Sequence, residues 1–284
     1  MENFDILVIG AGAAGIAAAK AAYSAGCRSI ALVDCEKSMG GILVQCSHRG
    51  FGMNLSGQEY TSQLLSDFPQ DIVFYPQTTV LSIIKDRMAL LSGNREIKFK
   101  ELILAAGCRE IAPGALDISG TRPKGVYTAG TMQKLMNVYG FEPEGPVVIL
   151  GSGDLGLIMA RAISDLGIEV TIVEKEAQCG GMARNRAFLA EGRVALLCSH
   201  TVKEIYGEPK IEKVRLSDGR LLPCATLLIA AGLVPDRDLI CGLEDMDWLQ
   251  LCGNCKSVHP MVEGVVAEGI QAGITAYERI RNRK

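Results

Sequence analysis

Aromatic side chains are scarce in this 284-residue chain, which has 7 Phe, 7 Tyr and a single Trp. Single-stranded nucleic acid binds by stacking its bases on aromatic rings, so this scarcity argues against such a surface. Neither sign of charge is in large excess: Lys and Arg total 29, Asp and Glu total 32, and the net charge is −3. The chain therefore lacks the basic surface that a polyanion needs, and we expect no nucleic-acid partner.

Long apolar segments are also missing. Every hydrophobic run breaks at Gly, Asp or Arg within about a dozen residues, whereas a membrane-spanning helix needs about 20. The first five residues, Met-Glu-Asn-Phe-Asp, lack the basic charge with which a signal peptide begins. We therefore expect no membrane span and a cytoplasmic location. Hydrophobic residues still make up 48% of the chain, which excludes a disordered protein.

Cysteine is the residue present in unusual number, with ten copies. In a cytoplasmic protein these are expected to be reduced thiols. Only Cys252 and Cys255 form a CxxC pair. A zinc or iron–sulfur site normally needs two more ligands at metal spacing, and His259 would supply a third at most. We therefore expect no metal site.

An internal repeat is the most informative feature of the sequence. Residues 6–15 read ILVIGAGAAG and residues 147–156 read VVILGSGDLG, so each copy is an apolar run that ends in GxGxxG. Downstream, IALVDCE at 30–36 matches VTIVEKE at 170–176. Each copy therefore reads strand, glycine-rich turn, helix, strand and acid.

This order is the fingerprint of a dinucleotide-binding unit. The first glycine makes a tight turn, the second lets the backbone approach a pyrophosphate, and the third lets helix and strand pack closely. Asp34 lies 19 residues after Gly15, and Glu174 lies 18 after Gly156. Both spacings are close to the ~20 expected of an acid that binds ribose hydroxyls. The sequence therefore predicts an α/β protein with two Rossmann-like domains.

The remaining elements surround these units. Two buried strands, 101–104 and 226–229, each end in Ala-Ala-Gly. Helices are predicted over 58–68 and from about Pro260 to Arg281. Further short strands are predicted at 71–75, 79–84, 87–91, 96–99, 214–216 and 221–222.

Both fingerprints, both Ala-Ala-Gly strand ends and the Cys-Gly-Asn-Cys at 252–255 resemble the flavoproteins with two dinucleotide-binding domains, of which thioredoxin reductase is nearest in size. The resemblance implies FAD at the first fingerprint and NAD(P)H at the second. It implies three-layer ββα domains, the second inserted into the first. The FAD domain would comprise residues 1–108 and 233–284, and the NAD(P) domain residues 109–232.

A subgroup is closer. The segments GGILVQC at 40–46, GCRE at 107–110 and GSGDLGLIMAR at 151–161 resemble the small FAD subunits associated with glycerol-3-phosphate dehydrogenase-like, hydrogen cyanide synthase and opine oxidase complexes. This subgroup implies hydride transfer between NAD(H) and FAD in an electron-transfer subunit, with a partner flavoprotein or iron–sulfur subunit. A homodimer is a further expected assembly. Thioredoxin reductase itself matches poorly, because the stretch at 126–131, which corresponds to its CxxC, has no cysteine.

The resemblance assigns the following residues to FAD: Gly10, Gly12, Ala13, Ala14, Gly15, Asp34, Gly41, Ile42, Val80, Ala106, Gly107, Gly253, Asn254, Met261 and Val262. Asp34 would bind the adenosine ribose, and Gly41 and Ile42 would lie near the flavin. Asn254 stands where the family usually has an acid that holds the ribityl chain, and Asn can make that hydrogen bond without a charge. Met261 and Val262 begin a helix whose N-terminus should point at the flavin.

The nicotinamide nucleotide is assigned a second set: Gly151, Gly153, Asp154, Leu155, Gly156, Glu174 and Gly232. Glu174 favours the free ribose 2′-OH of NAD and would repel the 2′-phosphate of NADP. Lys175 is a mild counter-signal, without an Arg pair beside it. We therefore expect NAD rather than NADP.

Hydride transfer needs no side-chain acid, base or nucleophile, so no firm catalytic residue is predicted. The weak candidates are Cys46, His48, Cys252 and Cys255. Each cysteine is either a redox thiol near the flavin or a small buried hydrophobe, and His48 is either a donor or a solvated turn residue. The alternative function is a stand-alone NADH-dependent reductase of disulfides or sulfur species; a non-catalytic subunit that holds nucleotides is a third hypothesis. The basic residues of 279–284 are interpreted as a solvated helix end or a docking patch.

Overall fold

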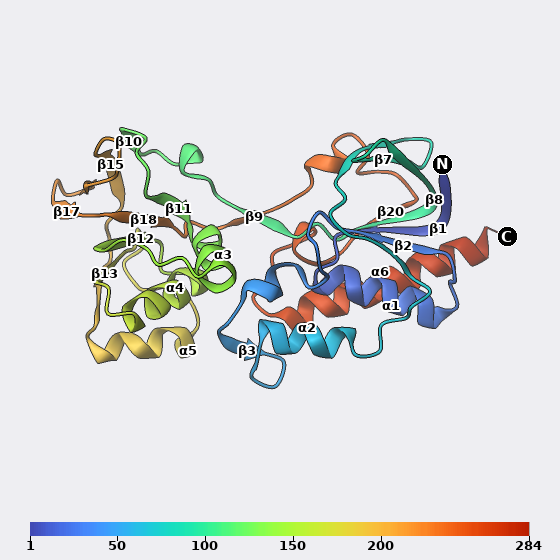
Figure 1. Cartoon of the computed structure of the whole chain (residues 1–284), viewed down its shortest axis with the longest axis horizontal. Helices are drawn as coiled ribbons and strands as arrows, with labels where there is room; N and C mark the ends of the chain where they lie inside the picture. Colours follow the sequence, from blue (N-terminus) through green and yellow to red (C-terminus); the bar gives the residue numbers. More distant parts are fainter. Residues whose placement is uncertain (284) are drawn as a thin grey trace. The chain divides into compact units, whose positions relative to one another are not determined.

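The computed structural model describes residues 1–283 (Figure 1). The chain divides into two compact units. The discontinuous unit comprises Met1–Arg109 and the chain from Val234 onward, and the inserted unit comprises Glu110–Leu233. These boundaries fall one residue from those expected.

One seven-stranded sheet forms the centre of the discontinuous unit. Its strands follow the order β5-β2-β1-β8-β7-β6, and β20 also pairs with β8. The strands are β1 Glu2–Ile9, β2 Ile30–Val33, β5 Val73–Tyr75, β6 Val80–Ile84, β7 Met88–Leu91, β8 Arg95–Leu104 and β20 Leu249–Leu251. A separate hairpin pairs β3 Arg49–Phe51 with β4 Leu55–Ser56.

Side chains alternate across β1 and separate two hydrophobic clusters. Ile6 and Val8 pack with the helix layer, whereas Leu7 and Ile9 pack on the opposite face with Trp248. The helices of this unit are α1 Ala13–Ala25, α2 Gly57–Leu65 and α6 Val262–Asn282. Figure 1 shows α1 and α6 side by side along one face of the sheet.

Small residues allow α6 to approach α1 closely. A Cβ atom at Gly269 would lie 2.3 Å from the carbonyl oxygen of Ala14, and one at Gly273 would lie 2.1 Å from that of Ala18. Gly269 and Gly273 therefore form the contact of α6 with α1.

Strand β8 belongs to two pairings along its length, which corrects the prediction of separate strands at 96–99 and 101–104. It pairs parallel with β1 along almost its whole length, while its other edge pairs antiparallel with β7 in the first half and parallel with β20 in the second. Burial alternates up to Lys100 and is continuous from Glu101 to Leu104. The change from one covered face to two produced the apparent break in the sequence pattern.

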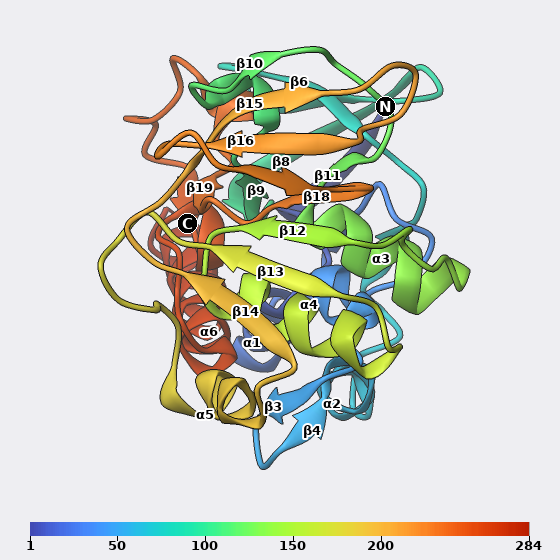
Figure 2. The same ribbon diagram turned by 90° about the vertical axis from the view of Figure 1, so that its left-hand side faces the viewer.

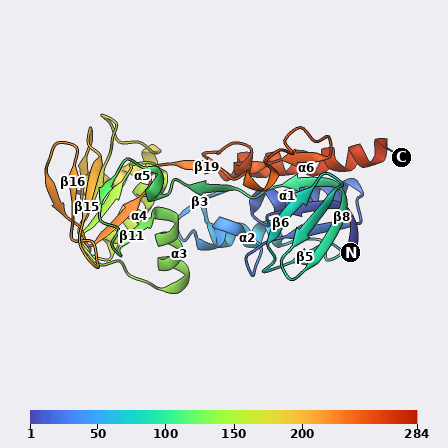
Figure 3. The ribbon, with the colours of Figure 1, turned by 90° about the horizontal axis from the view of Figure 1, so that it is seen from above.

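The inserted unit has a five-stranded parallel sheet in the order β11-β18-β12-β13-β14 (Figure 2). A second sheet, β10-β15-β16-β17, covers one of its faces, and helices cover the other (Figure 3). The parallel strands are β11 Val126–Thr128, β12 Val147–Leu150, β13 Val170–Val173, β14 Val194–Leu197 and β18 Thr226–Ile229. The second sheet contains β10 Ser119–Gly120, β15 Val202–Tyr206, β16 Lys213–Leu216 and β17 Leu221–Pro223. The helices are α3 Ala129–Tyr139, α4 Asp154–Asp165 and α5 Ala183–Arg186.

The same alternation organises this unit. Val147 and Ile149 of β12 face the helices, and Val148 and Leu150 face the second sheet. Two further short strands, β9 Cys108–Glu110 and β19 Leu233–Pro235, pair with each other. The predicted fold, with two three-layer Rossmann-like domains, is confirmed.

Two predicted elements are shorter than expected by two residues or more. The helix expected over 58–68 is α2, which begins at Gly57 because Ser56 and Glu59 form a capping box. It ends at Leu65. The strand expected over 71–75 contains only the last three of those residues.

Two arginines of the basic tail also bind a buried acid, although their side chains stay 41% and 36% exposed. Glu101 is fully buried, and its carboxylate lies 2.6 Å from Nη1 of Arg283 and 3.8 Å from Nη1 of Arg279. Burial raises the pKa of Glu101, and the arginines oppose that rise. A buried carboxylate needs a cation nearby, so these ion pairs fix the C-terminal end of α6 to the sheet.

No helix within residues 1–283 is long and apolar enough to cross a membrane.

Candidate functional site: two dinucleotide cradles

The first glycine-rich turn joins β1 to α1. Gly10 has φ +100°, and a Cβ there would lie 2.4 Å from the carbonyl oxygen of Ala105. A Cβ at Gly15 would lie 1.7 Å from the carbonyl oxygen of Gly10. At Gly12, by contrast, a Cβ would meet nothing within 4 Å. The outer glycines therefore close the turn against the sheet, and the middle one faces open space.

The second turn repeats this arrangement between β12 and α4. A Cβ at Gly151 would lie 2.3 Å from the carbonyl oxygen of Ala230, and one at Gly156 would lie 2.3 Å from that of Gly151. Gly153 faces open space, as Gly12 does. The two Ala-Ala-Gly strand ends therefore pack in the same way against the first glycine of each turn. We call each glycine-rich turn, with the acid and the helix N-terminus beside it, a dinucleotide cradle.

The acids of the two copies are also held alike. Asp34 accepts hydrogen bonds from the N–H groups of Ala11, at 2.6 Å, and Glu36, at 2.8 Å. A carboxylate has about four lone-pair positions. The two N–H groups and the thiol of Cys35 use three of them, so Asp34 keeps capacity for a ribose hydroxyl.

Glu174 accepts from the N–H groups of Ser152, at 2.8 Å, and Glu176, at 2.9 Å. It also accepts from Oγ of Ser152 at 2.5 Å. Burial works against ionisation of Glu174, but these bonds together with the N–H of Lys175 outweigh it and lower its pKa. These donors hold Glu174 as a fixed anion at the end of β13.

Helix N-termini complete each cradle. Gly12 and Gly153 are the N-caps of α1 and α4, and neither helix has a side-chain capping bond. The carboxylate of Asp154, in the first turn of α4, instead accepts from the N–H of Met182 and from Nδ2 of Asn185, both at 2.7 Å. The first-turn N–H groups are therefore left as donors for an anion. Uncapped donors beside an open glycine fit the pyrophosphate of FAD or NAD.

Three segments far apart in sequence meet at the N-terminus of α1. A Cβ at Gly41 would lie 3.0 Å from Cα of Gly12, and one at Gly253 would lie 2.7 Å from Cβ of Ala14. Ile42, in the short 3-10 helix Gly41–Gln45, is 61% exposed. These predicted FAD residues lie together.

The other predicted residues border the same turns. Val80 begins β6, two residues after Thr78, whose N–H donates to the carbonyl of Asp34. Gly107 follows the Ala-Ala-Gly strand end with φ +78° and open space beside it, next to Ala106. In the inserted unit, Gly232 accepts from the N–H of Ile111, and Leu155 lies in the first turn of α4.

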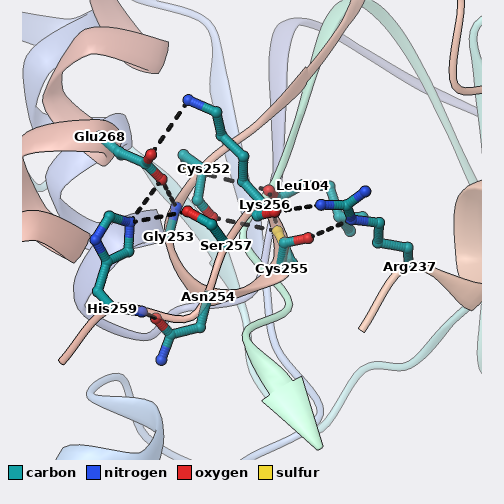
Figure 4. Close-up of polar contacts among 10 residues, drawn as sticks. All are labelled: Leu104, Arg237, Cys252, Gly253, Asn254, Cys255, Lys256, Ser257, His259 and Glu268. Atoms are coloured by element: carbon teal, nitrogen blue, oxygen red, sulfur yellow. Dashed lines mark hydrogen bonds and ion pairs between the residues drawn. The ribbon is translucent and has the colours of Figure 1, made fainter. Parts of the chain in front are cut away.

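The loop between β20 and α6 carries the second part of the predicted flavin site (Figure 4). Glu268 of α6 accepts from the N–H of Gly253 at 2.9 Å. The Oδ1 atom of Asn254 accepts from the N–H of His259 at 3.0 Å. Helix α6 begins at Val262, with Met261 as an N-cap that makes no side-chain capping bond, so its first-turn N–H groups are also left as donors.

A family model described as "pyridine nucleotide-disulphide oxidoreductase" matches residues 4–249. The chain belongs to this family. The family and its relatives indicate an FAD-dependent NAD(P)H oxidoreductase.

One of the opine oxidase subunits of Agrobacterium tumefaciens (strain Ach5) is 28% identical over 84% of this chain and 54% of the relative. The assimilatory nitrate reductase electron transfer subunit of Bacillus subtilis (strain 168) is 29% identical over 59% of this chain and 23% of the relative. The chain thus spans about half or less of the length of these curated relatives. The crystal structure of T. acidophilum thioredoxin reductase superposes with a TM-score of 0.83 at 20% identity, covering 99% of this chain and 100% of that one, which shows a shared fold.

The cysteines of this family member are poorly placed for thiol chemistry. Cys46 is 6% exposed, its Sγ contacts the carbonyl of Ile42, and burial raises its pKa to about 12. Cys252 and Cys255 are fully buried, and burial raises the pKa of both thiols. Cys255 donates to the carbonyl oxygen of Leu104 at 3.0 Å (Figure 4). Since the thiolate is the reactive form, these are structural thiols. Within residues 1–283, no group of three His, Cys, Asp or Glu side chains is placed to hold a metal ion.

A carboxylate lies at the N-terminus of α3, in the stretch that the resemblance compares with the CxxC of thioredoxin reductase. Oε1 of Glu110 accepts from the N–H of Gly130 at 2.8 Å. A Cβ at Gly130 would lie 2.7 Å from Oε2 of Glu110, so a side chain there would displace this carboxylate. His48, the remaining candidate, is partly buried, with its ring 5.1 Å from that of Phe51.

Sequence reasoning missed Ser152, Glu268 and Glu110. Ser152 fills a variable position of the fingerprint, and its hydroxyl joins Glu174 to the N–H of Gly180. Glu268 and Glu110 contact backbone groups that are distant in the chain, and such contacts leave no local pattern to detect.

Proposed function

We propose that the chain transfers a hydride between NAD(H) and FAD as the electron-transfer subunit of a multi-subunit dehydrogenase. FAD would occupy the cradle of the discontinuous unit, and NAD(H) that of the inserted unit. The observation that carries the proposal is the duplicated cradle, in which an open glycine, an uncapped helix and a fixed acid recur in both units.

The protein's own residues supply binding and orientation. The first-turn N–H groups of α1 and α4 would bind the two pyrophosphates, and Asp34 would accept from the adenosine ribose. Bound FAD supplies the redox chemistry, since its flavin ring accepts or donates a hydride. No side-chain acid or base is required, which agrees with the raised pKa values of the buried thiols.

Glu174 supports NAD over NADP. Its lowered pKa keeps it ionised at neutral pH, where an anion would repel a 2′-phosphate. Its backbone partners also hold it in place, so it cannot easily turn away to admit that phosphate.

Two observations support electron transfer to another protein chain rather than to a small disulfide. The cysteines that a stand-alone reductase would use are buried. Relatives of this chain include proteins named as an opine oxidase component and as an electron transfer subunit. A glycerol-3-phosphate dehydrogenase-like flavoprotein or an iron–sulfur subunit is the partner that we propose.

Anaerobic mixing of the purified, FAD-loaded chain with NADH tests the hydride step. NADH should bleach the visible flavin absorbance, and NADPH should do so much more slowly. A flavin that neither nucleotide bleaches would refute the proposal. Co-purification of the native complex, followed by identification of its other chains, tests the partner.

A further inference from the structure

The carboxylate of Glu268 connects three groups of the loop between β20 and α6 (Figure 4). Besides the N–H of Gly253, its oxygens lie 3.2 Å from Nε2 of His259 and 3.2 Å from Nζ of Lys256. The Glu268 and His259 side chains are only 21% and 22% exposed. Burial opposes ionisation of Glu268, but the bonds from His259, Lys256 and Gly253 prevail and lower its pKa. It is therefore an anion at neutral pH.

This network determines which atom of Asn254 faces a ligand. The N–H of His259 occupies Oδ1 of Asn254, and the Nδ2 atom points away from the network in Figure 4. Within residues 1–283, Nδ2 has no protein hydrogen-bond partner. The side chain can therefore offer a donor, whereas an acid at this position could only accept.

Helix α6 contacts the side chain of His259. Its ring packs over Gly264, where a Cβ would lie 2.7 Å from Nδ1 and 3.3 Å from Cε1. Glu268, one turn further along the helix, faces the same ring. Helix α1 packs closely beside this part of α6, since a Cβ at Gly269 would lie 2.3 Å from the carbonyl oxygen of Ala14. Lys256 and His259 are the basic side chains in contact with Glu268.

We propose that Glu268 is the positioning residue of the flavin site. It holds the backbone of Gly253 and the ring of His259, and thereby fixes Asn254 so that Nδ2 donates to the ribityl chain of FAD. This role rests on the proposed function, because it requires FAD to bind in the discontinuous unit.

Titration of FAD into the flavin-free, full-length chain tests this role. Glu268→Ala should weaken FAD binding at least tenfold, because it removes charge-assisted hydrogen bonds. Glu268→Gln should restore part of the affinity, because its amide oxygen can still accept from Gly253. Glu278→Ala is the matched control, since Glu278 is an exposed acid on the same helix and should leave FAD binding unchanged. NADH affinity should stay at the wild-type value in all three variants.

Gly264→Ala separates positioning from stability. Alanine is the better helix former, so the flavin-free chain should unfold at the wild-type temperature or above. The added methyl displaces the His259 ring, and FAD binding should still weaken severalfold. Wild-type FAD affinity in Glu268→Ala would overturn the proposal, as would parallel losses of FAD and NADH affinity with a lowered unfolding temperature. A wild-type chain that binds no FAD would instead refute the proposed function.

Discussion

Replacing single glycines by alanine separates the two cradles and distinguishes folding from cofactor binding. Gly12 and Gly153 have ordinary φ angles of −77° and −63°, and a Cβ at either meets nothing within 4 Å. Gly15 and Gly156 lie three residues further on, where a Cβ would lie 1.7 Å or 2.3 Å from a backbone carbonyl oxygen. The four variants add the same methyl group to different surroundings.

The expected magnitudes follow from these distances. At Gly12 and Gly153, alanine is a poorer N-cap but restricts the unfolded chain, so stability should change by less than about 1 kcal/mol. At Gly15 and Gly156 the obstacle is backbone that cannot rotate away, so we expect a loss of at least about 3 kcal/mol. A loss of that size lowers the unfolding temperature by roughly 6–12 °C in a chain of this size class.

Ligand affinity should show the opposite ranking. A methyl group at Gly12 would stand between the N–H groups of α1 and the FAD pyrophosphate. The loss of one or two charge-assisted hydrogen bonds, at about 1.5–3 kcal/mol each, weakens binding by at least tenfold. Gly153→Ala should do the same for NADH alone.

Thermal unfolding of the flavin-free chain and calorimetric titration of FAD and NADH check both expectations. Wild-type FAD affinity in Gly12→Ala would show that no phosphate lies against this turn. Loss of NADH binding in Gly12→Ala, with loss of FAD binding in Gly153→Ala, would mean that the cofactor assignment is reversed. Wild-type stability in Gly15→Ala would contradict the packing argument.

Three further predictions follow from the charges and thiols. With a pKa of about 12, only about one part in ten thousand of the Cys46 thiol is thiolate at pH 8. Iodoacetamide should therefore modify exposed Cys241 long before Cys46 in the folded chain. Early labelling of Cys46, detected by mass spectrometry, would contradict this. Glu174→Gln should raise the KM for NADH severalfold in steady-state assays, whereas the control Glu176→Gln should leave it unchanged. An unchanged KM in Glu174→Gln would show that Glu174 does not bind the ribose. Because the folded-state pKa of Glu268 is lowered, its contribution to stability is complete above the unfolded pKa of about 4.3 and is lost as the pH falls through the folded value. The difference in urea-unfolding midpoint between wild type and Glu268→Gln should therefore persist at pH 6–8 and vanish near pH 3, and a difference that instead grows toward pH 3 would give the wrong sign.

The cradles could be predicted from sequence because their chemistry is local. A tight turn, an open backbone approach and a close helix contact each require glycine at a fixed spacing, and the structure places Gly10, Gly12 and Gly15 in those three surroundings. The duplication of this pattern predicted the fold. Strand β8 was divided wrongly because a single strand changes from one covered face to two, and the pattern of burial changes with it.

The sequence by itself determined two dinucleotide-binding units, their order and the acid of each. Only the tertiary structure decided what the other polar residues do. Glu268 contacts Gly253 across 15 residues, Glu110 contacts Gly130 across 20, and Arg283 contacts buried Glu101 across 182. Ion pairs and hydrogen bonds of this kind depend on where two elements pack, and no fixed spacing in the chain encodes them. The same reason applies to the ten cysteines, since packing determines which thiols are buried and therefore unreactive.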